Sequence, residues 1–288
     1  MKNLINYYYN MNIDNIAEYN NNHIVFYNNR IYYFRKIDDS LNIYFINQII
    51  NNNKYSFFSY KIINNIYNTY ITKSDNDNYV MLEIDQDYDK TIDFTDMIMF
   101  YAKSENFLSN VNYKNNWKDL WINKIDYLNE YSIKNLLYKN NIYSLYLYYS
   151  YLCESLFIYM NNIDVSLIKP SICHRRMYFN IKKIDFYDPF NYMVDCKYRD
   201  IAGYIKSLYY INEDYISELK YFLNTNKLSY NEAKLFYSRI IYPSIFFDYY
   251  EEGINAQYSY LPDEYEKFIK KTYEIINSYV HIDNIDWL

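Results

Sequence analysis

The chain has 288 residues, enough for one large domain or two lobes, and it carries a formal net charge of −6. A protein that holds duplex nucleic acid needs a dense basic face, so this charge disfavours a nucleic acid partner. The sequence has no apolar run of about eighteen residues, which argues against a transmembrane helix, and its N-terminus lacks the apolar core of a secretion signal. We therefore expect synthesis in the cytoplasm, without export.

The 44 tyrosines predict an aromatic core with hydroxyls hydrogen-bonded at its edges.

The first third of the chain has the pattern of β-strands. Aromatic and β-branched residues at 24–27 and 31–34 flank Asn28 and Asn29, which tolerate a tight left-handed turn. A helix is expected over 40–50, and a second hairpin pairs 67–72 with 79–84. A charged stretch near residues 83–90 then interrupts the strand pattern.

Helical spacing follows from residue 94 onward. Trp117, Trp121, Ile125 and Leu128 fall on one helical face. Ser229 to Glu232 forms a capping box for a helix that Pro243 should kink or end. A further helix is expected over 262–279. The chain is thus predicted to be α+β, with a β-rich lobe at 1–88 and a helical lobe at 89–288.

Three cysteines, Cys153, Cys173 and Cys196, form no CxxC pair and are expected to be buried free thiols rather than disulfides or metal ligands. A hydrolase built on Cys173 and His174 is disfavoured, because neighbouring residues seldom point at each other. Glycine occurs at only two positions, so a Gly-rich phosphate loop is excluded. Lys36 is the best strand lysine for a phosphate, but the sequence has no glutamate between Glu18 and Glu83 to position it.

The irregular stretch 169–199 and the start of the following helix carry a resemblance to a known family. Ile172 to Asn180 reads ICHRRMYFN, residues 184–188 read IDFYD, and 198–202 read YRDIA. Together they resemble the His-x-Asp-x-x-x-x-Asn loop, the metal-binding Asp and the Asp-Leu-Ala helix start of the aminoglycoside and choline kinase superfamily. The segments 117–128 and 235–252 are similar to its spore coat branch, the CotS and YutH type. This resemblance implies a protein kinase-like fold with a small antiparallel-sheet lobe and a mainly helical lobe.

The same resemblance implies that the catalytic residues are lost. His174 matches the family's His, but Arg176 stands at the position of the catalytic Asp, and an arginine cannot accept a proton. Asn180 lies one position before the metal-binding Asn. Either Asp188 or Asp185 matches the metal-binding Asp, and Asp200 takes the structural role of tying the loop to the helix.

Two functions follow from the resemblance. The first is a non-catalytic, pseudokinase-like spore coat protein that binds other coat proteins, reaches the spore coat or forespore surface from the mother-cell cytoplasm, and needs no cofactor. In it, Arg175, Arg176, Lys182 and Lys183 could receive an acidic partner. The alternative is an active ATP- and Mg²⁺-dependent small-molecule phosphotransferase.

Overall fold

The computed structural model describes residues 1–13, 15–37, 59–74, 77–108, 116–135, 137, 142–252 and 261–286. The chain divides into two compact units, which are described one at a time. Unit 1 contains residues 1–100 and 180–193, and unit 2 contains residues 101–179 and 194–288. This division groups residues 89–100 and 180–193 with the N-terminal sheet, whereas the sequence-based boundary at residue 88 assigned them to the helical lobe.

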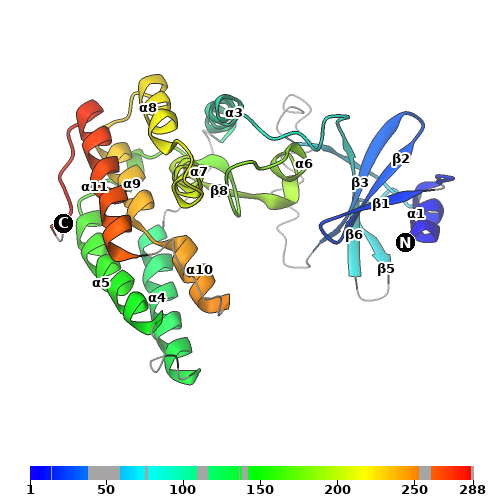
Figure 1. The fold of residues 1–288 in the computed structure, drawn as a ribbon. Coiled ribbons are helices and arrows are strands. Elements are labelled where there is room, and N and C mark those ends of the chain that lie inside the picture. Colours follow the sequence, from blue (N-terminus) through cyan, green and yellow to red (C-terminus); the bar gives the residue numbers. More distant parts are fainter. Residues whose placement is uncertain are drawn as a thin grey trace. The chain divides into compact units, whose positions relative to one another are not determined.

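Unit 1 is built on an antiparallel sheet with the strand order β1-β2-β3-β6-β4, and β5 also pairs with β6 (Figure 1). One short helix, α1, lies beside this sheet. The bounds of these elements are α1 Lys2–Tyr9, β1 Ile16–Tyr19, β2 Asn22–Tyr27, β3 Arg30–Ile37, β4 Lys61–Ile63, β5 Thr72–Ser74 and β6 Asp77–Ile84.

The sheet buries both of its faces, because successive side chains of a strand point to opposite sides. Val25, Phe34 and Met81 pack with Ile5 and Tyr9 of α1 on one face. The other face is larger. Its buried residues include Ile24, Tyr33, Ile37, Val80 and Leu82 from the strands, and Ile184 and Phe190 from the later part of the unit.

The first predicted hairpin is confirmed. β2 and β3 pair from His23 with Phe34 to Tyr27 with Arg30. Asn28 has φ 50° and Asn29 has φ 59°, the left-handed geometry of a two-residue turn whose twist matches that of the strands.

The second predicted hairpin is right in its return strand and wrong in its first strand, which begins at Thr72 instead of residue 67. The reason is Asn65, whose side-chain oxygen accepts the backbone N–H groups of Tyr67 and Thr69 and holds a loop there. Asn68 has φ 59°, a left-handed geometry that is incompatible with a strand. The helix predicted over 40–50 lies outside the described residues.

The second part of unit 1 is fixed to the first by backbone hydrogen bonds. The N–H of Ile184 donates to the carbonyl of Tyr88 at 2.9 Å, and the N–H of Tyr60 donates to the carbonyl of Tyr187 at 3.0 Å. Helix α6, Lys183–Phe186, and the 3₁₀ turn Pro189–Asn191 lie in this segment. Asp185 and Asp188 therefore have fixed positions relative to the sheet.

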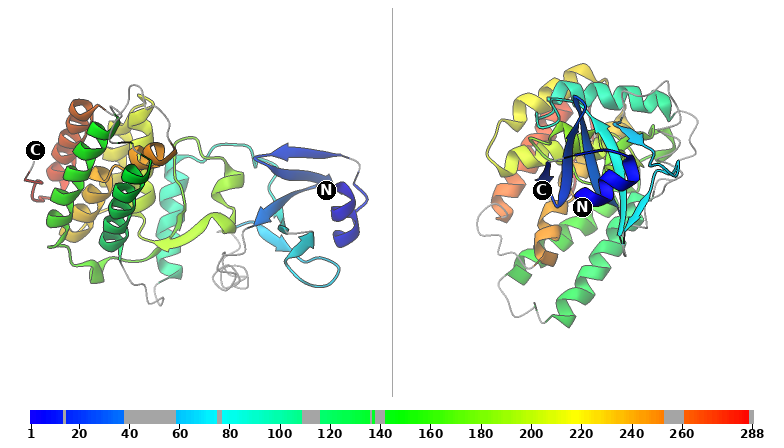
Figure 2. Two further views of the ribbon diagram at one scale, coloured as in Figure 1. Left: turned by 90° about the horizontal axis from the view of Figure 1, so that it is seen from below. Right: turned by 90° about the vertical axis from the view of Figure 1, so that its right-hand side faces the viewer.

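Unit 2 is mainly helical, and α5, α9 and α11 pack side by side in it (Figure 2). Helix α3, Phe94–Phe107, continues from unit 1 into unit 2, and β7 forms a two-stranded sheet with β8. The remaining bounds are α4 Trp117–Lys134, α5 Ile142–Met160, the 3₁₀ turn Val165–Leu167, β7 Ser171–His174, β8 Tyr192–Asp195, α7 Tyr198–Tyr210, α8 Tyr215–Thr225, α9 Tyr230–Ile241, α10 Ser244–Glu252 and α11 Pro262–Tyr279.

The predictions of a buried apolar face on α4, of a capping box on α9 and of an end to α9 near Pro243 are confirmed. The predicted apolar face of α4 is buried. Ser229 accepts the N–H of Glu232, and the Glu232 carboxylate accepts the N–H of Ser229, which completes the capping box of α9. Helix α9 ends two residues before Pro243, whose ring disfavours helical geometry at the residue before it.

The core of unit 2 is aromatic, and several of its buried tyrosine hydroxyls have hydrogen-bond partners, as expected. The hydroxyl of Tyr265 donates to the last carbonyls of α9, at Ile240 and Ile241, both at 3.0 Å. The hydroxyl of Tyr198 donates to the Glu232 carboxylate at 2.7 Å. These bonds let Tyr198 and Tyr265 fill the core with their hydroxyls hydrogen-bonded.

Candidate functional site

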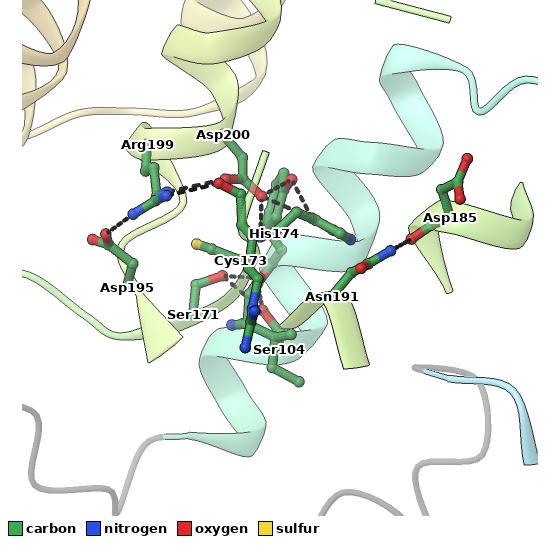
Figure 3. A network of polar contacts seen from close by, with 12 residues as sticks. Ser104, Ser171, Cys173, His174, Asp185, Asn191, Asp195, Arg199 and Asp200 are labelled. Carbon is green, nitrogen blue, oxygen red and sulfur yellow. Dashed lines mark hydrogen bonds and ion pairs between the residues drawn. The ribbon is translucent and has the colours of Figure 1, made fainter. Parts of the chain in front are cut away.

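The loop that follows β7 is tied to the start of α7 by Asp200 (Figure 3). One carboxylate oxygen of Asp200, Oδ2, accepts the backbone N–H of His174 at 2.7 Å and contacts His174 Nδ1 at 2.8 Å. It also accepts the Tyr101 hydroxyl at 2.8 Å. His174 and Asp200 are each 1% exposed. A carboxylate only accepts hydrogen bonds, so His174 Nδ1 carries the proton in this contact.

The rest of this loop is also held in one conformation. The Phe179 N–H donates to Ser207 Oγ at 2.7 Å, and Arg199 donates to the carbonyl of Arg175 at 2.9 Å. A Cβ placed on Gly203 would lie 3.1 Å from the carbonyl oxygen of Met177, tighter than most Cβ contacts, so glycine eases the close approach of α7 to the loop.

Arg176, which the resemblance predicts to stand at the position of the family's catalytic Asp, is a surface group. Its side chain is 73% exposed, and the nearest carboxylate oxygen, Asp248 Oδ2, lies 3.9 Å away. A guanidinium has no acceptor site, so in this position it cannot take the proton of a hydroxyl nucleophile. Asn180 has φ 61°, a left-handed geometry that asparagine tolerates in loops. The roles of these residues stay predictions.

Asp188, one of the two candidate metal ligands, lies in unit 1 and forms an ion pair with Arg35 of β3. Its side chain is 1% exposed, and its Oδ1 caps the following 3₁₀ turn by accepting the Phe190 N–H at 3.0 Å. Arg35 is also fixed by Asn191, whose side-chain oxygen accepts from the guanidinium at 3.0 Å. Both Asp188 oxygens are therefore engaged within the protein.

Asp185, the other candidate, also has a partner inside unit 1. Its carboxylate accepts the Tyr19 hydroxyl at 2.7 Å. Its backbone carbonyl accepts from the Asn191 amide at 3.0 Å (Figure 3). Burial raises the pKa of Asp185 above the usual carboxyl value. A raised pKa weakens a carboxylate as a ligand for Mg²⁺, which needs the charged form.

Lys36 pairs on the surface with Asp77 at 2.7 Å, an acidic partner that the search for a glutamate between Glu18 and Glu83 overlooked. Arg35 is the strand cation that the sequence reasoning missed. A signal was present, because position 35 shares a strand face with Tyr33 and Ile37, both buried, and an arginine on a buried face needs an acidic partner.

All three cysteines are buried free thiols, as expected. Cys173 donates to the carbonyl of Cys196 at 3.2 Å, and burial raises the pKa of the Cys173 thiol, which makes it a poor nucleophile. The described residues contain no group of three or more His, Cys, Asp or Glu side chains able to hold a metal ion. None of the described helices is long and apolar enough to cross a membrane.

The antiparallel sheet followed by a mainly helical region is a protein kinase-like fold, and solved phosphotransferases share it. An aminoglycoside phosphotransferase from Alicyclobacillus acidocaldarius matches with a TM-score of 0.66 and 11% identity over 94% of both chains. Spectinomycin phosphotransferase, solved with ADP and spectinomycin, matches with a TM-score of 0.59 and 11% identity over 97% of both chains. Amicoumacin kinase matches with a TM-score of 0.54 and 9% identity over 95% of this chain and 91% of its own. These low identities establish the fold alone.

The family follows from the sequence as a whole. The model of the family described as "Spore coat putative kinase YutH" matches residues 2–282, so the chain belongs to that family. No protein with curated function matches the chain.

Proposed function

We propose that this protein is a non-catalytic member of the spore coat kinase-like family, and that it acts by binding other coat proteins. The observation that carries this proposal is the ion pair between Asp188 and Arg35. A metal-binding carboxylate must offer its oxygens to Mg²⁺, whose remaining ligands come from water and nucleotide phosphates. Asp188 instead offers one oxygen to a guanidinium and the other to a backbone N–H.

The position of Arg176 supports the same proposal. The general base and the metal ligand serve different parts of phosphoryl transfer. The base orients the nucleophile, and the metal that the ligand holds neutralises charge on the phosphates, so the two losses are independent. An active enzyme would have to replace both, together with the Gly-rich loop that the sequence lacks.

The competing function is an ATP-dependent small-molecule phosphotransferase. It draws support from the word kinase in the family description and from the phosphotransferases that share the fold. The two functions differ in whether Mg²⁺ strengthens nucleotide binding through Asp188.

Calorimetric titration with ATP, with and without Mg²⁺, separates them. We expect either no binding or binding that Mg²⁺ leaves unchanged, and the Asp188→Ala variant should behave like the natural protein. Binding that Mg²⁺ strengthens at least tenfold, with the gain lost in Asp188→Ala, would favour the phosphotransferase.

The coat role is tested separately in a sporulating host. A fluorescent fusion should collect around the forespore, since the proposal places the protein on the developing coat. Diffuse fluorescence in the mother cell throughout sporulation would count against this role.

A further inference from the structure

Helix α5 of unit 2 has very few charged side chains for a helix with a solvent-exposed face. Its 19 residues include one charged side chain, Glu154. Helix α11 lies beside it (Figure 1) and has 18 residues, of which seven are charged, as is usual for a helix with one solvated face. The tyrosine- and isoleucine-rich composition of the whole chain therefore does not explain the low charge of α5.

One face of α5 is used inside unit 2, and the opposite face is exposed. The buried residues include Tyr146, Leu152 and Leu156. The exposed positions are 144, 147, 151, 154 and 158, which follow one another at steps of three and four residues. Side chains at these steps align along one side of a helix, so α5 has a continuous outward face.

This outward face is apolar over most of its length. Leu147 is 37% exposed, Tyr151 65% and Ile158 69%. Glu154, which is also exposed, lies between Tyr151 and Ile158. We call these four residues the α5 stripe. Solvated helices usually carry polar side chains at such positions, and large apolar side chains that are aligned on a surface are typical of a protein interface.

The order of residues along the α5 stripe makes it complementary to a second copy of itself. When two copies of a helix pack antiparallel about a twofold axis, one end of each faces the other end of its partner. With the axis midway along the stripe, Leu147 faces Ile158 of the second copy, so the apolar ends cover each other. In the same arrangement Tyr151 faces Glu154 of the second copy, and its hydroxyl can donate a hydrogen bond to that carboxylate.

The distribution of charge also favours a second copy over a charged partner. The chain has a net charge of −6, so most surfaces of two copies repel each other. At the α5 stripe each copy contributes one carboxylate, and each carboxylate lies next to a tyrosine hydroxyl of the other copy. A strongly basic or acidic partner would find little opposite charge to pair with there.

We propose that two copies of this protein associate through the α5 stripe, with their α5 helices antiparallel and the twofold axis between Tyr151 and Glu154. A single helical stripe is narrower than the interface of an obligate dimer, so the association should be reversible, with a dissociation constant of about 1–100 µM. The stripe contains none of the residues that match the kinase motifs. The proposal therefore holds whether or not the protein transfers phosphate.

Sedimentation equilibrium of the full chain over a range of concentrations measures this association. Tyr151→Glu places a carboxylate opposite Glu154 of the second copy and should weaken the association by about tenfold or more. Ile133→Glu is the matched control, because Ile133 lies on α4 outside the stripe, is 66% exposed and gains the same charge. It should leave the dissociation constant unchanged, and urea melts check that both variants are folded. A natural protein that stays monomeric at about 0.5 mM, or equal weakening by Ile133→Glu, would overturn the proposal.

A double variant tests whether positions 151 and 154 face each other. Tyr151→Glu combined with Glu154→Lys places each new carboxylate opposite a new ammonium group of the second copy. This variant should recover most of the affinity that Tyr151→Glu loses. If the double variant associates as weakly as Tyr151→Glu alone, positions 151 and 154 do not meet across the axis, and the proposed arrangement is wrong.

Discussion

Replacing Asp200 by alanine should destabilise the protein strongly, because this carboxylate joins three buried donors. Its Oδ2 lies 2.7 Å from the His174 backbone nitrogen, 2.8 Å from His174 Nδ1 and 2.8 Å from the Tyr101 hydroxyl. Each buried donor left without an acceptor costs about 1–3 kcal/mol. Since the histidine ring and the tyrosine hydroxyl can partly reorient, we expect a total loss of about 3–5 kcal/mol.

Arg176→Ala is the matched comparison from the same loop. Its side chain is 73% exposed and its nearest carboxylate is 3.9 Å away, so the free energy of unfolding should change by less than about 0.5 kcal/mol. Asp200→Asn keeps one acceptor oxygen, so its loss in free energy of unfolding should lie between those of Arg176→Ala and Asp200→Ala.

Urea unfolding followed by circular dichroism measures all three variants against the natural protein. The slope of the free energy against urea concentration should stay constant, so that midpoints report stability. If Arg176→Ala proves more destabilising than Asp200→Ala, the assignment of the loop after β7 to the kinase catalytic loop is wrong, and the functional argument that rests on it fails.

Three further predictions concern other parts of the fold. Burial lowers the pKa of Lys206 to about 7. Above pH 7 the native protein releases a proton that the unfolded chain still binds. The free energy of unfolding should therefore rise between pH 7 and 9, by up to about 1.4 kcal/mol per pH unit. Urea midpoints should rise with pH in the natural protein and stay constant in Lys206→Met. A rise that persists in Lys206→Met would mean that another group causes it. Ser229→Ala should cost about 1 kcal/mol by breaking the capping box of α9, and an unchanged urea midpoint would contradict this. Tyr19→Phe removes the donor to Asp185, which should raise the pKa of Asp185 further; NMR titration of its carboxyl carbon measures this, and an unchanged or lower pKa would contradict it.

The sequence predicted features that depend on neighbouring residues. The Asn28–Asn29 turn and the capping box at Ser229 follow from local backbone geometry, and both are present. The strand assigned to 67–72 failed because the side chain of Asn65 forms a loop with the next four residues, a contact that strand propensity does not describe.

The candidate site could be predicted only in part. The resemblance to the kinase family pointed to Asp188 and Asp200 and predicted that Asp200 ties the loop to the helix, as it does through the His174 N–H, but it did not give the partner of Asp188. Arg35 and Asp188 are far apart in the chain and meet only because the segment 180–193 packs on the sheet.

The most direct test of the central proposal is a phosphate-release assay with the purified protein. The protein is incubated with γ-labelled ATP and Mg²⁺ beside a heat-treated sample and the Asp188→Ala variant. We expect all three samples to release the same amount of phosphate, because Arg176 cannot act as a base and Asp188 is held by Arg35. Stoichiometric release above the heat-treated sample, abolished by Asp188→Ala, would show that the protein is an active phosphotransferase.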